Sequence, residues 1–198
     1  MVQSVMKLAT STQALEELMI GNERFFMGEV VHPHQSSSRR AEVQASQEPF
    51  ALILTCADSQ LDPSIIFDQG LGDLYTIRVG GNIVDQVVLG SIELAIRKFD
   101  IPLLMVMGHS RCSAVEAAVT GEATGHVFGL IDAIQPALDR AKAEAGDLID
   151  NTVRANAIVT AEELRHAEPF LAERFHAGKL KIVAAYYDGV TGEVEILA

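Results

Sequence analysis

Short apolar runs separated by helical segments are the feature of this sequence that most restricts its fold. Three such runs are FALILTC (50–56), DLYTIRV (73–79) and IPLLMVMGH (101–109). Their apolar residues are nearly continuous rather than alternating, which is typical of strands that are buried on both faces. Sheets built from such strands are mainly parallel and carry helices on both faces. The sequence therefore predicts an α/β fold.

The rest of the core follows the same pattern. Residues 85–98 and 162–176 have the apolar spacing of helices, and two further strands, 180–188 and 194–198, flank the turn GVTG. We expect a mainly parallel sheet of about four to five strands flanked by helices, with an antiparallel edge strand at the C-terminus.

The N-terminal part has a different organisation. Residues 11–27 place apolar side chains at helical spacing behind a Ser/Thr cap, so we expect an amphipathic helix there. Residues 28–48 contain Gly, Pro and a run of serines, and we expect a connecting loop. In this interpretation residues 1–48 form a helical arm and residues 49–198 form the α/β core of one domain. The arm has little local core to cover, which suggests that it wraps around a second subunit.

Length and charge exclude several classes of protein. A chain of 198 residues can bury a sizeable core within one domain. Its formal net charge of −12 argues against a nucleic-acid-binding surface, which needs clustered Lys and Arg. The sequence has no apolar stretch long enough to cross a bilayer, and its N-terminus lacks the features of a secretory signal. We therefore expect a cytoplasmic protein with no nucleic-acid or membrane partner.

Two cysteines and a histidine fall at the ends of predicted strands. Cys56 ends the first strand, His109 ends the third, and Cys112 follows three residues later. The carboxyl ends of neighbouring parallel strands meet at one edge of a sheet, so these side chains are expected to converge. Zinc prefers such sulfur and nitrogen donors in a tetrahedral arrangement.

The spacing alone leaves another interpretation open. Two cysteines in a reducing compartment can be small core residues, and a histidine at a strand end can be a satisfied structural residue. The coincidence of all three residues at one edge favours zinc. Three protein ligands leave a fourth position open, as in catalytic zinc sites.

The motifs around these residues resemble those of the β-class carbonic anhydrases. The resemblance rests on C-x-D-S at Cys56, GHSRC (108–112), GNERF (21–25), GDLYTIRVGGN (72–82) and YYDGVTGEV (186–194). These motifs occur in the family's order and spacing, and they extend over nearly the whole chain.

The resemblance implies a function and a set of site residues. It implies one Zn²⁺ per chain held by Cys56, His109 and Cys112, and reversible hydration of CO2 to bicarbonate and a proton. Asp58 would accept a hydrogen bond from the attacking oxygen, and Gln47 and Gly81 would contact the substrate. The family also implies a homodimer or a dimer of dimers.

Departures from the family pattern lie close to these residues, at positions 60 and 113 and at Val79-Gly80, where the family commonly has Asn-Ala. The family has an arginine two residues after the aspartate, where this chain has Gln60, and usually a glycine after the second cysteine, where this chain has Ser113. A glutamine amide cannot form a bidentate, charge-assisted pair with a carboxylate. We therefore expect Asp58 to be under-anchored, unless Arg78 or Arg111 compensates.

This expectation leaves three functions open. The first is CO2 hydration, either unchanged, weakened or shifted to alkaline pH. The second is hydrolysis of carbonyl sulfide or carbon disulfide on the same scaffold. The third is a catalytically silent zinc protein with a binding or regulatory role.

Overall fold

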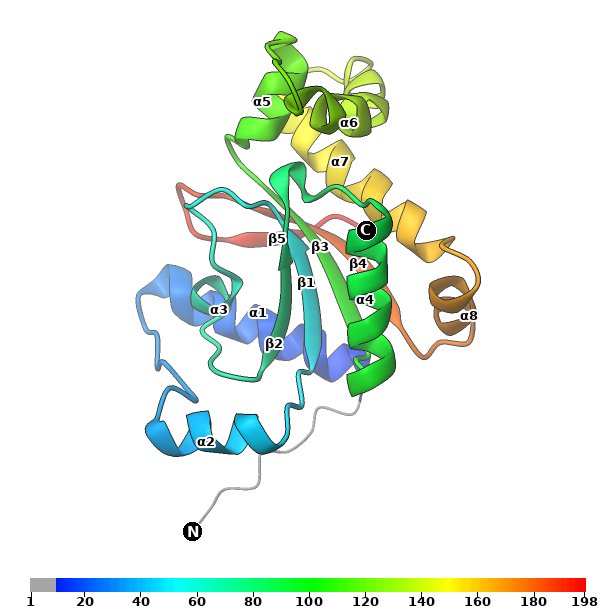
Figure 1. The fold of residues 1–198 in the computed structure, drawn as a ribbon. Coiled ribbons are helices and arrows are strands. Elements are labelled where there is room, and N and C mark those ends of the chain that lie inside the picture. The colour runs from blue at the N-terminus through cyan, green and yellow to red at the C-terminus, as the bar shows by residue number, and fades with distance from the viewer. Residues whose placement is uncertain (1–9) are drawn as a thin grey trace.

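The computed structural model describes residues 10–198 and contains one five-stranded sheet (Figure 1). The strands lie in the order β2-β1-β3-β4-β5. Their bounds are Ala51–Thr55 for β1, Leu74–Arg78 for β2, Leu103–His109 for β3, Lys181–Tyr187 for β4 and Val194–Ile196 for β5. The first four strands are parallel and β5 is antiparallel to β4. The predicted fold class is confirmed.

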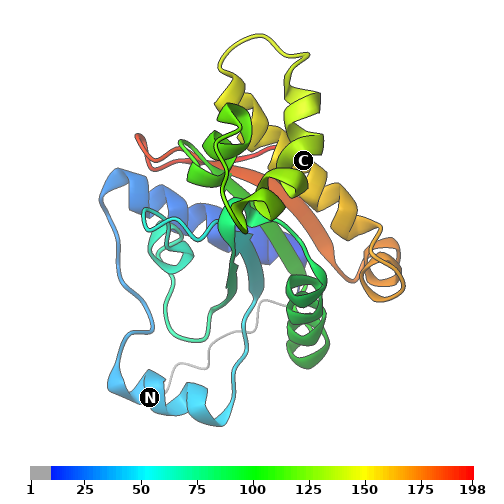
Figure 2. The ribbon, with the colours of Figure 1, turned by 45° about the horizontal axis from the view of Figure 1, so that its top comes forward.

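Alternate residues of the central strands enter two separate hydrophobic clusters. Ile53 of β1 and Met105 of β3 pack with α1 (Ser11–Met27) on one face of the sheet. Leu52 and Leu104 pack on the other face, with the helices α4 (Gln86–Phe99), α7 (Leu148–Arg165) and α8 (Phe170–His176). This two-sided burial explains why the strands are apolar at consecutive positions. Figures 1 and 2 show the sheet between these two layers of helices.

The N-terminal helix is fixed to the core of its own chain by one buried side chain. Asn22 donates hydrogen bonds from Nδ2 to the carbonyls of Ile66 (3.2 Å) and Gly192 (2.8 Å), and its Oδ1 accepts one from the Val194 N–H (2.8 Å). The helix ends at Gly28, which adopts a left-handed conformation with φ of 74°. The GNERF motif therefore docks α1 against the turn before β5.

Two secondary-structure predictions need correction. The segment 28–48 is not only a loop, because it contains α2 (Ser37–Ala45), whose N-cap Ser36 accepts a hydrogen bond from the Arg39 N–H at 3.1 Å. The serine run is thus a helix start rather than a linker. The single helix predicted over 162–176 is divided into the end of α7 and the separate α8, which has Pro169 at its N-cap. Proline lacks the N–H that a continuing helix needs.

The remaining helices surround the carboxyl edge of the sheet. A short 3-10 turn, η1 (Gly80–Asn82), follows β2, and α5 (Ser113–Thr120) follows β3. The helix α6 (Val127–Ala141) lies next to α5 above this edge in Figure 1, and the four-residue α3 (Pro63–Ile66) lies beside α1 and the edge strand β2. Across residues 10–198, no helix is both long and apolar enough to cross a membrane.

Candidate metal centre

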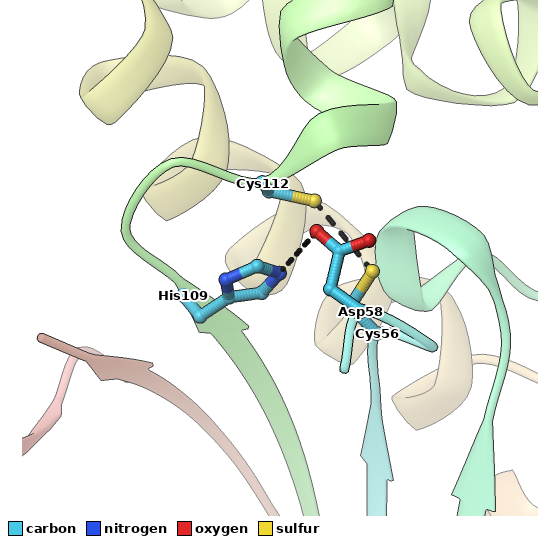
Figure 3. A group of neighbouring side chains, drawn as sticks. All are labelled: Cys56, Asp58, His109 and Cys112. Carbon is cyan, nitrogen blue, oxygen red and sulfur yellow. Dashed lines mark hydrogen bonds and ion pairs between the residues drawn. The ribbon is translucent and has the colours of Figure 1, made fainter. Parts of the chain in front are cut away.

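The strand ends bring four potential metal ligands together. In the parallel register Thr55 of β1 lies opposite Met107 of β3, so Cys56 and His109 leave the sheet at nearly the same height. Cys112 follows as the N-cap of α5, and Asp58 follows Cys56 by two residues. One ligand atom from each of the four residues lies within 4.8 Å of the others. Figure 3 shows the four side chains pointing toward one another.

The two thiols form a buried pair. Their sulfur atoms are 3.7 Å apart, and both residues are at most 1% exposed. The hydrogen bond from Cys112 lowers the pKa of Cys56 to about 4, and hydrogen bonds to His109, Asp58 and Gly81 act in the same direction against the effect of burial. The pKa of Cys112 is raised, first by its hydrogen bond with Cys56 and then by burial. The pair therefore holds one proton and one negative charge near neutral pH.

The turn η1 supports the Cys56 sulfur from the side of β2. The Gly81 N–H donates a hydrogen bond of 3.3 Å to Cys56 Sγ. Gly81 has a φ of 67°, a conformation that side chains disfavour, and a Cβ there would lie 2.8 Å from the Ile134 side chain. Gly81 is thus buried against the thiol, at the predicted site.

His109 presents one nitrogen to this pair. Its Nδ1 lies 2.9 Å from the Ser110 carbonyl oxygen, which only accepts hydrogen bonds, so Nδ1 carries the proton. Nε2 is therefore the nitrogen with a free lone pair. It is buried, and among the residues that the structure describes it has no hydrogen-bond partner. Nε2 lies 3.4 Å from Asp58 Oδ2.

These observations fit a bound zinc ion. A tetrahedron built on zinc–sulfur bonds of about 2.3 Å has an edge of about 3.8 Å, close to the separation of the two sulfurs. A buried polar atom without a partner is costly, and a metal bond to His109 Nε2 would satisfy it. Two sulfurs and an imidazole nitrogen are donors that zinc prefers, and the proton on Nδ1 fixes the ring as usual for a metal-ligating histidine.

Asp58 is held by Ser113, contrary to the expectation that it would be under-anchored. The Ser113 hydroxyl donates to Oδ1 at 2.6 Å, and the Ser113 backbone N–H donates to Oδ2 at 3.0 Å. Burial opposes ionisation, but these two hydrogen bonds, with a smaller electrostatic contribution from the nearby His109 ring, outweigh it and lower the pKa of Asp58. The carboxylate thus has firm partners without an arginine at position 60.

The two candidate arginines do not bind the Asp58 carboxylate either. Arg78 donates to backbone carbonyls instead, to Asp58 at 2.6 Å and to Cys56 at 3.1 Å, and so fixes the loop that carries both residues. Arg111 is exposed and has a positive φ of 55°.

Gln60 contacts the histidine instead of the aspartate. Its Nε2 lies 3.3 Å from the Ser110 carbonyl oxygen and 3.0 Å from His109 Nδ1. With Nδ1 protonated, the imidazole and the amide both donate to the Ser110 carbonyl. Gln60 therefore has no hydrogen bond of its own to His109, and the two side chains share the Ser110 carbonyl as acceptor.

The structure does not bring Gln47 to this site within one chain. Gln47 is exposed and lies before β1, beside Ser46, Lys98 and Phe99, whereas Cys56 follows the other end of β1. A strand advances about 3.3 Å per residue, so the length of β1 separates the two residues. That Gln47 contacts substrate therefore stays a prediction, and within one chain β1 lies between Gln47 and Cys56.

Comparison with known proteins identifies the family. The family model for carbonic anhydrase matches residues 51–194. Carbonic anhydrase 2 of Mycobacterium tuberculosis is 37% identical over 179 residues, which cover 88% of this chain and 86% of the relative. The chain belongs to the β-carbonic anhydrase family. Carbonic anhydrase of Mycolicibacterium smegmatis is 34% identical over 188 residues, which cover 92% of this chain and 91% of that protein.

Solved β-carbonic anhydrases share the fold. The β-carbonic anhydrase CcaA aligns with a TM-score of 0.73 at 25% identity, covering 92% of this chain and 94% of that chain. One of two tetrameric β-carbonic anhydrases of Sordaria macrospora aligns with a TM-score of 0.74 at 20% identity, covering 80% and 85%.

The sequence did not reveal the residues that support the β-carbonic anhydrase centre. Ser113 was recognisable only as a departure from the family pattern, although a hydroxyl at the start of a helix and next to a ligand is a signal in itself. Arg78 acts through backbone carbonyls, and Asn156 acts through the carbonyl of Gly81 at 2.7 Å. No spacing in the sequence links Asn156 to this site.

Proposed function

We propose that this protein catalyses the zinc-dependent, reversible hydration of CO2 to bicarbonate and a proton. The observation that carries the proposal is the convergence of Cys56, Asp58, His109 and Cys112 within 4.8 Å. Cys56, His109 and Cys112 would hold one Zn²⁺ per chain. When bound, zinc lowers the pKa of water enough to provide a nucleophile near neutral pH.

Asp58 is the catalytic residue that we propose beside the metal. Its lowered pKa keeps it ionised at neutral pH, so it accepts a hydrogen bond and does not donate one. A fixed acceptor at this place orients the attacking water so that its lone pair faces the carbon of CO2. The Gly81 backbone lies against the cluster and bounds the space in which a small linear substrate can lie.

We also propose a homodimer or a dimer of dimers. The helical arm exposes several large apolar side chains among its polar ones, with Ile20 50%, Met27 61% and Val31 64% exposed. Large exposed apolar residues that gather on one surface mark places where proteins associate. An assembly is also the one way in which Gln47 can approach a substrate, because it would then come from the neighbouring chain.

The proposed location is the cytoplasm. Cys56 and Cys112 are free thiols whose sulfur atoms lie 3.7 Å apart. An oxidising compartment would favour a disulfide between such neighbours, and a disulfide would remove two of the proposed ligands.

The decisive experiment is a stopped-flow assay of CO2 hydration on protein of known zinc content. We expect turnover that disappears on chelation, returns with added zinc, and falls strongly in Asp58→Ala with zinc retained. Ser91→Ala is a matched control, because it removes a hydroxyl that is hydrogen-bonded within α4. Folded, zinc-replete protein without CO2 hydration would contradict the proposal, and parallel assays with carbonyl sulfide and carbon disulfide would then test hydrolysis of these molecules.

A further inference from the structure

We propose that Ser113 is the positioning residue of Asp58, which it clamps through both carboxylate oxygens and keeps beside the metal position as an acceptor rather than as a fourth ligand. The inference rests on the zinc site of the proposed function. It assigns to Ser113 the part that the family gives to the arginine at the position of Gln60.

The geometry of the clamp restricts the carboxylate in two ways. The hydroxyl binds Oδ1 at 2.6 Å and the backbone N–H binds Oδ2 at 3.0 Å. Two donors on one residue fix both the place of the carboxylate and its rotation about the last side-chain bond. A single donor would leave that rotation free. The hydrogen bonds are charge-assisted, the stronger class of such bonds.

The clamp is rigid because of where Ser113 lies. It is the first residue of α5, directly after the N-cap Cys112. The first N–H groups of a helix have no partner within the helix, so the Ser113 N–H is available to a carboxylate without loss elsewhere. The positive end of the helix dipole also favours a negative group at this place.

The other end of Asp58 is fixed as well. Arg78 holds the Asp58 carbonyl at 2.6 Å and the Cys56 carbonyl at 3.1 Å. The main chain on one side and the carboxylate on the other are thus both restrained. Asp58 Oδ2 lies 3.4 Å from His109 Nε2, and a further shift of the carboxylate would lengthen or break its hydrogen bonds to Ser113.

Among the residues that the structure describes, no other side chain holds the Asp58 carboxylate through both oxygens. Gln60 is directed to His109 and the Ser110 carbonyl, and Arg78 contacts only backbone oxygens in this loop. The hydrogen bonds of 3.0 Å or less to the Asp58 carboxylate both come from Ser113. The departures from the family pattern at positions 60 and 113 are therefore linked. Ser113 takes the role of holding Asp58, which the family gives to the residue at position 60.

The test uses protein whose zinc has been replaced by Co²⁺ and measures the relaxation of water protons, which reports whether solvent reaches the metal. We expect wild-type protein to enhance the relaxation. Ser113→Ala should lose most of the enhancement, because the released Asp58 takes the open position. Ser113→Thr, which keeps a hydroxyl, and the double variant Ser113→Ala/Asp58→Ala should both retain it. Ser91→Ala should behave as wild type.

The same variants give a kinetic readout. Ser113→Ala should lower the kcat of CO2 hydration by about ten- to hundredfold, the effect of one lost hydrogen bond to a charged group, with zinc content unchanged. Wild-type relaxation in Ser113→Ala would overturn the inference, as would wild-type protein that already excludes solvent from cobalt. If the relaxation changes as expected and wild-type protein has no hydration activity, the clamp stands and the proposed function fails.

Discussion

The side-chain amide of Asn156 donates a hydrogen bond of 2.7 Å to the carbonyl oxygen of Gly81. Asn156 is buried in α7, and the Gly81 N–H donates to the sulfur of Cys56. A helix on one side of the sheet thus fixes the turn that contacts the thiolate.

Replacing Asn156 should therefore affect both stability and metal binding. Asn156→Ala leaves the buried Gly81 carbonyl without its donor, and we expect a loss of about 1–3 kcal/mol in the free energy of unfolding. We also expect weaker zinc binding, because outer contacts of metal ligands commonly contribute about tenfold or more to affinity. Chemical denaturation and competition with a chelator measure the two effects. Stability loss with unchanged zinc affinity would limit Asn156 to packing.

Zinc binding should release about one proton per chain from the two thiols at neutral pH. Cys56, with a pKa of about 4, is already a thiolate, whereas Cys112 has a raised pKa and keeps its proton until the metal binds. Calorimetry of the zinc-free protein in buffers of different ionisation enthalpy measures the number. Elemental analysis should find about one zinc per chain, and Cys112→Ser should lower it. Release of two protons would contradict a thiolate at Cys56.

Gln60 should affect the metal through His109 and not through Asp58. Gln60→Ala removes an amide that shares the Ser110 carbonyl with His109 Nδ1, and we expect zinc affinity to change by less than about tenfold, because the Ser110 carbonyl still fixes the ring. Solvent access to cobalt should stay as in wild type, because Ser113 still holds Asp58. Loss of that access in Gln60→Ala would show that the two supports are coupled.

Gln47 should contribute to a site of the neighbouring chain. Gln47→Ala and Asp58→Ala should each lower CO2 hydration with folding and zinc content retained. Coexpression of the two variants forms mixed assemblies in which one site combines an intact Asp58 with an intact Gln47. We expect the purified mixed dimer to be more active than either variant alone. Equal activity of Gln47→Ala and wild type would assign Gln47 to the surface, and a monomeric protein in light scattering would exclude this arrangement.

Asp68 should make the stability of the fold depend on pH. Burial opposes its ionisation, but the N–H groups of Val31 and His32 and the Arg24 guanidinium, which lies 2.6 Å away, lower its pKa. A lowered pKa in the folded state stabilises the protein above the unfolded value of about 4, and this stabilisation is lost as pH falls through the folded value. Asp68→Asn should therefore unfold more easily than wild type at pH 7, and the difference should shrink toward pH 3. A difference that is independent of pH would assign the effect to packing.

The sequence predicted the parts of this fold that depend on local pattern. Continuous apolar runs located the first four strands, and helical spacing located α1 over residues 11–27 as observed. The same logic placed Cys56, His109 and Cys112 at one edge, because the ends of parallel strands must meet. The prediction of a loop over residues 28–48 missed α2, because the serine run at its start is typical of both loops and helix starts.

The residues that hold the metal ligands in place could not be predicted from such local patterns. Whether Gln60 turns toward Asp58 or His109 depends on the path of the loop between β1 and α3, and position 60 alone does not determine that path. Ser113 was visible in the sequence, but its partner is 55 positions away. Only the tertiary structure shows that the hydroxyl and the N–H of one residue both face Asp58.

The three hydrogen bonds of Asn22 determine when the docking of α1 can be completed during synthesis of the chain. Two of its partners, Gly192 and Val194, are 170 and 172 positions later in the chain. The first helix can therefore form on the ribosome but cannot finish docking until residues 192–194 have emerged. Closing such long-range contacts is slow, so the hydrogen bonds of Asn22 to Gly192 and Val194 form late in folding. The step that completes the docking of α1 also joins two segments that lie 170 positions apart in the chain.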